Sequence, residues 1–443
     1  MNDILLKNEA VNRYLQQVCK QVRAKEVHQD IQMELLSHLE ELIDDKLSVG
    51  ISLETAIEQA LSQVGDPILI GKQFHAAHKP VMEWGLAAIV AILVGIGFLA
   101  MYAMKFAVDQ SFRDIFLPNQ LTYAAIGVIM MVLVYYLDYR KLQNYSWWIY
   151  GCAIGLMVLC HWFGVWVNGS RSFLAIGRFG VNVYEVVPYL FMIAFAGKIV
   201  TDRRRGQERQ MNTWITILVY FVLPGYFYIM SPLMDGLIVH CVGITVLHIV
   251  MTRQFKLLLG CMASFMLMIA LAVFMIQDKL GFIIMRVTSW FNPTQDPSGS
   301  GYMYLTLSKV IRSAGLWGQG FGVQMKHLPY IYNDMIFPYL IYSLGWCFGL
   351  LLVSMVCILI GHTIRISLQL KDPFGRALII GLSTVISFKF IYSMLMSVGL
   401  LPITSIAMPL ISYGGNALVM NMTVMGIMLS VYRRKNMLSQ YAK

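Results

Sequence analysis

The stretch LPYIYNDMIF at residues 328–337 marks the point where a polar loop runs into a long apolar segment. Its aspartate, Asp334, is the only carboxylate between Ser298 and Lys371. A lone acid at the edge of a membrane-spanning helix is costly unless it is paired, solvated or used. From the residues alone, a cap on the helix that follows and a chemical role explain Asp334 equally well. The stretch therefore predicts both the start of a membrane span and a candidate functional residue.

The composition outside this stretch indicates a membrane protein with several spans. Of the 443 residues, 58% are hydrophobic and only 13% are charged, which is too apolar for a soluble multidomain protein. Residues 1–80 hold 12 of the 24 acidic residues but only 8 of the 34 basic ones. We expect an acidic head on a basic membrane body, whose positive charge fits cytoplasmic loops and anionic lipid rather than nucleic acid.

The acidic head at residues 1–80 is expected to form a small cytoplasmic domain of three amphipathic helices. Apolar residues at helical spacing place these helices near 4–22, 25–47 and 52–63, the last one capped by Ser52 and closed by GDP at 65–67. The segment resembles the short helical domain that precedes some bacterial permeases and anti-sigma proteins. That resemblance implies docking or regulation, and a passive cytoplasmic cap explains the segment equally well.

The rest of the chain, residues 81–443, is expected to form an all-α polytopic transmembrane domain. About ten segments approach the roughly 20 apolar residues that a helix needs to cross the bilayer core. They lie near 84–104, 120–137, 146–167, 183–200, 213–231, 236–251, 257–276, 335–361, 378–398 and 416–432.

The distribution of lysine and arginine predicts the orientation of these spans. The basic residues of the short loops fall on the side of the N-terminal head, so we expect that side and both termini to be cytoplasmic. The outer face then holds a short loop near 168–182, a long loop at 277–334 between spans seven and eight, and a loop near 399–415. A loop as long as 277–334 is usually functional, and an interfacial helix is expected within it at 302–312.

Charged residues gather toward the expected outer face. The carboxylates Glu185, Asp235 and Asp334 lie there, and Arg171 and Arg178 precede Glu185. A carboxylate suits proton acceptance and an arginine fork suits phosphate oxygens, so the set suggests an outward-facing polar cavity. For Glu185 alone a structural ion pair is the better explanation, and for Asp235 a helix-terminal role. The seven cysteines show no metal-type spacing.

Several short motifs resemble the SEDS family, the FtsW/RodA/SpoVE group of bacterial cell-wall glycan polymerases. The resemblance runs in the family's order from about residue 84 to the end, and its two C-terminal motifs are the most specific. The motifs are NGSR at 168–171, GQGFG at 318–322, LP and DMIF within 328–337, GLLPIT at 399–404 and PLISYGG at 409–415.

The resemblance implies an inverting, lipid II-dependent peptidoglycan polymerase at the outer face of the bacterial cytoplasmic membrane. In the family the acid that matches Asp334 is the residue assigned to catalysis, and it would deprotonate the acceptor sugar's 4-hydroxyl. The resemblance also allows a divalent cation, Mg²⁺ or Mn²⁺, and implies a class B penicillin-binding protein, a transpeptidase, as partner. The candidate substrate-binding residues are Arg171, Arg178, Lys326, Glu185, Ser412 and Tyr413. Of these, Arg171, Arg178 and Lys326 are the candidate cations for the leaving pyrophosphate.

The chain also departs from the family's pattern. The lysine that usually follows the glutamate by three residues is Pro188, and Ser172, Leu233 and Tyr342 replace other polar residues. These losses indicate a divergent paralogue and leave two alternatives open. One is a flippase for a lipid-linked precursor, with helices broken at Pro224-Gly225 and near Pro409. The other is a non-catalytic cell-wall or division scaffold that recruits partners through the acidic head.

Overall fold

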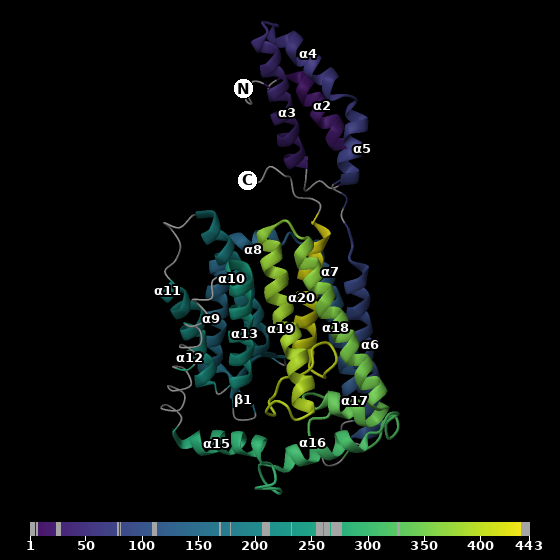
Figure 1. Cartoon of the computed structure of the whole chain (residues 1–443), viewed down its shortest axis with the longest axis vertical. Helices are drawn as coiled ribbons and strands as arrows, with labels where there is room; N and C mark the ends of the chain where they lie inside the picture. Colours follow the sequence, from purple (N-terminus) through teal and green to yellow (C-terminus); the bar gives the residue numbers. More distant parts are fainter. Residues whose placement is uncertain are drawn as a thin grey trace. The chain divides into compact units, whose positions relative to one another are not determined.

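The computed structural model divides the chain into two compact units. One consists of Met1–Glu83 with Val431–Lys443, and the other of Trp84–Ser430 (Figure 1). The residues that the structure describes are 5, 8–23, 28–77, 79, 81–108, 113–167, 170–177, 179–205, 213–231, 233–253, 260, 266, 277–325 and 328–435.

The first unit contains four described helices where the sequence predicted three. Their shared core buries Leu15, Leu39 and Ile57. The Ser52 hydroxyl caps the third helix as expected. The GDP motif, however, also begins a fourth helix, because Pro67 suits a first helical position and the Asp66 carboxylate accepts from the Ile68 amide at 3.1 Å. The helices are α2 (Glu9–Gln21), α3 (His28–Ser48), α4 (Leu53–Val64) and α5 (Pro67–Ala77).

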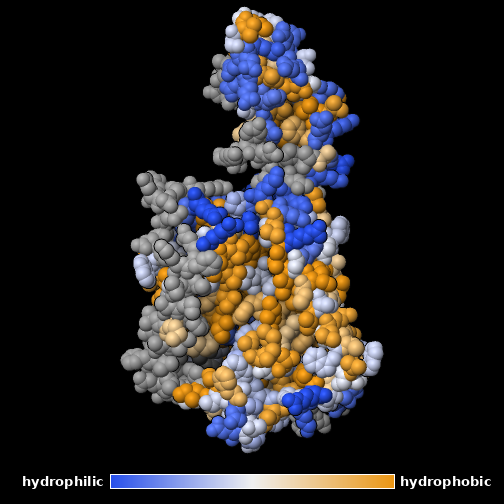
Figure 2. Space-filling model, in the orientation of Figure 1, coloured by the Kyte–Doolittle hydropathy of each residue, from blue (hydrophilic) through white to orange (hydrophobic). Residues whose placement is uncertain are grey.

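The second unit is a bundle of apolar helices. Among the described residues, eight helices are long and apolar enough to cross a membrane, and Figure 1 shows them running alongside one another. Figure 2 shows an apolar band on this unit between polar ends. The eight are α6 (Trp84–Ala107), α7 (Phe116–Tyr136), α9 (Ser146–Phe163), α10 (Val183–Arg205), α13 (Met234–Thr252), α18 (Trp346–Gln369), α19 (Pro373–Ser397) and α20 (Gly415–Arg433).

Two of the ten expected spans are not among these eight helices. The segment near 213–231 is a shorter apolar helix, and the expected span at 257–276 lies outside the described residues. The shorter helix is not broken at Pro224 but widens into a π-turn before it. A proline cannot donate to the carbonyl four residues earlier, here that of Tyr220, and His240 Nε2 lies 2.8 Å from that oxygen. Its parts are α11 (Thr213–Ile217), η4 (Leu218–Val222) and α12 (Leu223–Met230).

Helices α10 and α19 lie at the centre of the bundle. The buried share of the span is 78% for α10 and 67% for α19, but 17% for α7. Helix α10 packs against α9, α13 and α19. A polar side chain on the inner faces of α10 or α19 is therefore removed from lipid and has to find partners within the protein.

One end of the bundle carries the long loop and a small sheet. Helices α15 (Gln277–Phe291) and α16 (Tyr302–Ser313) lie across this end in Figure 1, and α16 confirms that a helix forms where one was expected at 302–312. The fold is thus nearly rather than entirely α-helical. The predicted third span ends at Phe163, and the β-branched and aromatic residues that follow pair into an antiparallel sheet. Its strands are β1 (Val165–Val167), β2 (Ser170–Ile176) and β3 (Phe179–Asn182); a short helix α8 (Arg140–Asn144) precedes α9.

The expected span at 335–361 is two helices, α17 (Ile336–Leu344) and α18, separated by Gly345. Gly345 has φ 89°, a conformation that ends a helix and that glycine adopts without strain. The glycine-rich run at 315–322 forms backbone hydrogen bonds to both sides of this break. Trp346 N donates to Gly315 O at 3.1 Å, and Gln319 N donates to Tyr342 O at 2.8 Å. Apolarity alone could not reveal the break, because both helices are apolar.

Candidate functional site

Asp334 lies in the turn that leads into α17. The N-cap of α17 is Met335 and has no side-chain cap hydrogen bond, so Asp334 does not cap this helix. The turn closes through Met335 N, which donates to Tyr330 O at 3.2 Å. Asp334 Oδ1 is buried and has no hydrogen-bond partner among the residues described here. A desolvated carboxylate oxygen without a donor is available to accept a proton.

The PLISYGG motif fixes the backbone on which Asp334 stands. The Ser412 hydroxyl donates to Asn333 O at 2.8 Å and accepts from Met408 N at 3.0 Å. Tyr413 N donates to Tyr332 O at 2.8 Å. The structure therefore places Ser412 and the Tyr413 backbone against the two residues before Asp334, where they position the turn.

Burial and two neighbouring acids set the protonation of Asp334. Burial, the largest cause, and the charges of Asp235 and Glu185 together raise the pKa of Asp334 from an ordinary value near 3.8 to about 7. These are the three acids that the sequence placed near the outer face. The structure brings them close enough to interact, although they come from α13, α10 and the turn before α17.

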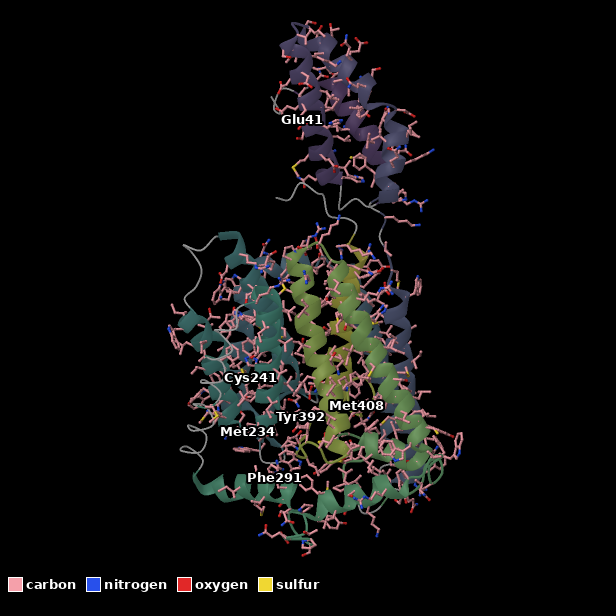
Figure 3. The ribbon with its side chains drawn as sticks, viewed as in Figure 1. Glu41, Met234, Cys241, Phe291, Tyr392 and Met408 are labelled. Atoms are coloured by element: carbon pink, nitrogen blue, oxygen red, sulfur yellow. The ribbon has the colours of Figure 1, made fainter. Side chains whose placement is uncertain are left out.

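Figure 3 labels three residues of the membrane unit that lie toward the same end of the bundle. Met234, which precedes Asp235, lies toward the end that carries α15, as do Tyr392 of α19 and Met408 of the loop before α20. Asp235 is in the first turn of α13. Its place agrees with the helix-terminal role expected from the sequence, because a negative charge is favoured at a helix N-terminus.

Glu185 is held by a lysine that sequence reasoning missed. Lys389 Nζ of α19 lies 2.5 Å from Glu185 Oε2, and the two side chains are 8% and 24% exposed. This confirms the ion pair that was expected for Glu185 and identifies its partner. The available signal was a lysine inside the apolar segment 378–398, which is costly unless the lysine is paired.

The ion pair between Lys389 and Glu185 compensates for one departure from the family's pattern. Pro188 occupies the position in α10 where the family usually has lysine. The ammonium beside Glu185 comes from α19 instead, so the loss at position 188 does not leave Glu185 without a cation.

Of the three cationic candidates, the structure describes Arg171. The Arg171 guanidinium donates to His161 O at 2.8 Å and lies 4.9 Å from the centre of the Trp166 ring, so it is engaged at the β1–β2 hairpin. Arg178 and Lys326 lie outside the described residues. Their proposed contacts with a pyrophosphate stay predictions.

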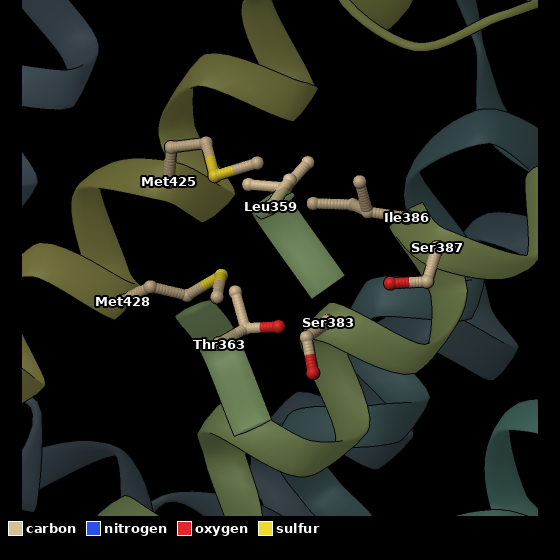
Figure 4. A pocket seen from close by; sticks show the side chains of 7 residues that line it. All are labelled: Leu359, Thr363, Ser383, Ile386, Ser387, Met425 and Met428. Carbon is tan, nitrogen blue, oxygen red and sulfur yellow. The ribbon is translucent and has the colours of Figure 1, made fainter. Parts of the chain in front are cut away.

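Two other kinds of site find little support in the described part of the chain. No group of three or more His, Cys, Asp or Glu side chains there is arranged to hold a metal ion. A narrow crevice between α18, α19 and α20 contains only apolar and hydroxyl side chains, as Figure 4 shows, so its lining offers no acid or base. Its lining residues are Leu359, Thr363, Ser383, Ile386, Ser387, Met425 and Met428.

The fold and the site together define a multi-pass membrane protein with a carboxylate at one end of its bundle whose Oδ1 atom is buried. Comparison with known proteins then identifies the family. The family model FTSW_RODA_SPOVE, described as cell cycle protein, matches residues 84–437, and the chain belongs to this family.

Named relatives agree with this assignment. Stage V sporulation protein E of Bacillus subtilis (strain 168) is 28% identical over 79% of this chain and 96% of its own length. A protein named probable peptidoglycan glycosyltransferase FtsW, of Thioalkalivibrio sulfidiphilus (strain HL-EbGR7), is 27% identical over 82% and 92%. The first 80 or so residues fall outside the family match.

Solved structures share the fold of the membrane unit. A chain from a study titled "Structural coordination of polymerization and crosslinking by a peptidoglycan synthase complex" aligns with TM-score 0.67 and 20% identity, over 82% of this chain and 99% of that one. The rod shape determining protein RodA of Thermus thermophilus aligns with TM-score 0.60 and 20% identity, over 80% and 98%.

Proposed function

We propose that this protein is a peptidoglycan glycosyltransferase that polymerises lipid II into glycan strands, with Asp334 as the general base. The observation that carries the proposal is the Asp334 carboxylate, whose Oδ1 atom is buried and lacks a hydrogen-bond donor among the described residues and whose pKa is raised to about 7. A base whose pKa lies near the working pH combines a useful deprotonated fraction with a useful affinity for the proton. The relatives named probable peptidoglycan glycosyltransferase FtsW support the same reaction class.

The reaction follows from what Asp334 can accept. The carboxylate takes the proton of the acceptor sugar's 4-hydroxyl while that oxygen attacks the anomeric carbon of the donor. The bond between the anomeric carbon and the pyrophosphate oxygen breaks, and its electron pair leaves with undecaprenyl pyrophosphate. Attack from the side opposite the leaving group inverts the anomeric centre. Arg171, Arg178 and Lys326 remain our candidates for stabilising the developing negative charge.

The cellular setting is part of the proposal. Basic residues in the short loops support a cytoplasmic location for both termini, which puts Asp334 at the outer face of the bacterial cytoplasmic membrane. A synthase complex for polymerisation and crosslinking is named for one structural relative. A class B penicillin-binding protein that crosslinks the new strands is therefore the partner we propose.

The test is the substitution Asp334→Asn in purified protein incubated with lipid II, with and without Mg²⁺, and read as polymer on a gel. The amide keeps the size of the side chain but cannot accept the proton, so polymer is expected to fall at least about 100-fold while the membrane level stays unchanged. Asp114→Asn is the matched control, because the Asp114 side chain is 85% exposed and pairs only loosely with Lys105 at 3.7 Å. Full activity of Asp334→Asn would end the base assignment, and movement of labelled lipid II across liposomes without polymer would favour a flippase.

A further inference from the structure

Lys389 is a buried charge to which the reaction above assigns no role. It lies in the middle of α19, its side chain is 8% exposed, and its Nζ contacts Glu185 Oε2. A lysine buried within a membrane bundle is costly, so its partner and neighbours define what it does. We infer that Lys389 is a positioning residue: by holding Glu185 as a paired anion, it limits the negative charge acting on Asp334 and keeps Asp334 able to lose its proton. This inference rests on the proposed function, in which Asp334 must be deprotonated to work.

The geometry fixes the ammonium from three helices. Lys389 of α19 reaches Glu185 of α10 at 2.5 Å, and its Nζ lies 5.5 Å from the centre of the Tyr189 ring, one turn further along α10. The Tyr189 hydroxyl donates to Asn421 Oδ1 of α20 at 2.7 Å, and the Tyr189 ring is fully buried. The lysine is thus clamped between a carboxylate and an aromatic face, so its charge is held at one place.

The charges around Asp334 explain why this matters. Glu185 and Asp235 both act on Asp334, and Lys389 attracts the same two acids. Removing the ammonium would leave two anions and Asp334 together, and neighbouring carboxylates make each other harder to ionise. The titratable groups that face this centre from the elements packed around it, within the described residues, are Glu185 and Tyr189 of α10, Tyr228 of α12, Asp235 of α13, Lys389 and Tyr392 of α19, and Tyr332 and Tyr413 of the loops.

The experiment measures the protonation of Asp334 directly. A hydrophobic carbodiimide reacts with the protonated carboxyl, so mass spectrometry of the peptide containing Asp334 gives a labelling midpoint as the pH is varied. Lys389→Met keeps an unbranched side chain of similar shape, one atom shorter, and removes its charge, and the midpoint is expected to move up by about half a pH unit or more. Glu185→Gln removes an anion and is expected to move the midpoint down.

The double variant separates action through Glu185 from any other effect. Because Lys389 acts by pairing with Glu185, Lys389→Met is expected to add little in the Glu185→Gln background. A midpoint unchanged in Lys389→Met, or an upward shift that persists in the double variant, would overturn the inference. Lys389→Arg keeps the charge and is expected to keep the wild-type midpoint. If Lys389→Met does not accumulate in the membrane, Glu185→Gln tests the inference instead. An unchanged labelling midpoint in Glu185→Gln would contradict it.

A second buried ion pair supplies the matched control. Lys198 Nζ lies 2.7 Å from Asp202 Oδ2 within α10, and the two side chains are 8% and 20% exposed, close to the values for Lys389 and Glu185. Neither residue is among the charges that act on Asp334. Lys198→Met should therefore leave the labelling midpoint of Asp334 unchanged. If Lys198→Met shifts the midpoint as much as Lys389→Met does, the shift reflects a general loosening of the bundle and the inference is wrong.

The two proposals can fail separately. Carbodiimide labelling reports on Asp334 whether or not the protein makes glycan, so it tests Lys389 without relying on activity. Polymer formation by Asp334→Asn tests the base assignment alone. Where the protein polymerises lipid II, the pH profile of the initial rate should shift in the same direction as the labelling midpoint in each variant, and opposite directions would contradict the positioning role.

Discussion

Asp334 combines two properties that oppose each other in a folded protein. Its Oδ1 atom is buried without a donor among the described residues, which disfavours the charged form, yet a general base must be charged to work. The structure meets both demands by setting the balance near neutral pH rather than by pairing the acid. Glu185, which is paired with Lys389, shows the other arrangement, in which the charge is satisfied and withheld from chemistry.

The raised pKa of Asp334, about 7, predicts how activity depends on pH. Below pH 7 the deprotonated fraction falls about tenfold per pH unit, so the initial rate of polymer formation should fall in the same proportion. The measurement is the rate with saturating lipid II between pH 5 and 9, with membrane level and fold checked at each pH. A rate that stays constant from pH 5 to 8 would exclude a base with this pKa.

Folding stability should show the opposite pH dependence. The folded-state pKa lies above the ordinary value of 3.8, so the folded protein holds the proton more tightly, and the stability this gives is lost as pH rises through 7. Asp334→Asn removes this loss. We expect its melting temperature relative to wild type to rise by about 2 °C or more between pH 5 and pH 8. Equal differences at the two pH values would contradict the shift.

Single residues were predictable where their charge conflicts with their surroundings. Asp334 and Glu185 stand out because acids are rare in apolar sequence, and the same signal was available for Lys389. The role of Ser412 was not readable, because its hydroxyl bonds to Asn333 O and Met408 N depend on how two distant loops fold together. The family resemblance suggested Ser412 as a substrate-binding residue, and the structure shows its hydroxyl bonded to the turn that carries Asp334.

At the scale of elements, the junction of α17 and α18 shows where apolarity stops being informative. Hydropathy located the apolar segment but could not show that Gly345 divides it, because both halves are apolar. The break depends on the run at 315–322, whose backbone bonds to Tyr342, Ser343, Trp346 and Cys347 tie a distant loop to the junction. The short helix α17 thereby carries the Asp334 turn at a place fixed by its neighbours.

Substitution of Gly345 tests this junction. An added Cβ would meet the Leu316 carbonyl, and the φ of 89° is strained for any other residue, so Gly345→Ala should destabilise the protein by about 1–3 kcal/mol. Gly361→Ala in α18 is the matched control, because nothing lies within 4 Å of its added Cβ and alanine favours a helix interior by about 0.5–1 kcal/mol. Thermal unfolding of both variants should therefore show changes of opposite sign. Equal melting temperatures would contradict the role assigned to Gly345.

At the scale of the whole molecule, the membrane unit was more predictable than the head. Membrane spans can be identified from length and hydropathy, and eight of the expected ten are long apolar helices within the described residues. The fourth helix of the head, α5, was missed because Pro67 was taken as a stop when it also suits a start. The sheet β1–β3 was missed because its strands are short and local pairing decides them.

The separation into two units allows the catalytic and scaffold readings to be distinguished. Asp334, Glu185, Asp235, Lys389 and Ser412 all lie within Trp84–Ser430, whereas the head has a hydrophobic core of its own. A protein lacking residues 1–83 should therefore polymerise purified lipid II at a rate within about twofold of the full chain, as expected when a separately folded unit is removed. In cells the same deletion measures recruitment, and Asp334→Asn in the full chain measures catalysis. If the deletion abolishes function in cells while Asp334→Asn has no effect there, the protein acts as a scaffold and the carboxylate has no catalytic role. If Asp334→Asn abolishes function while the truncated protein still makes polymer, the protein is an enzyme and the head determines where in the cell it acts.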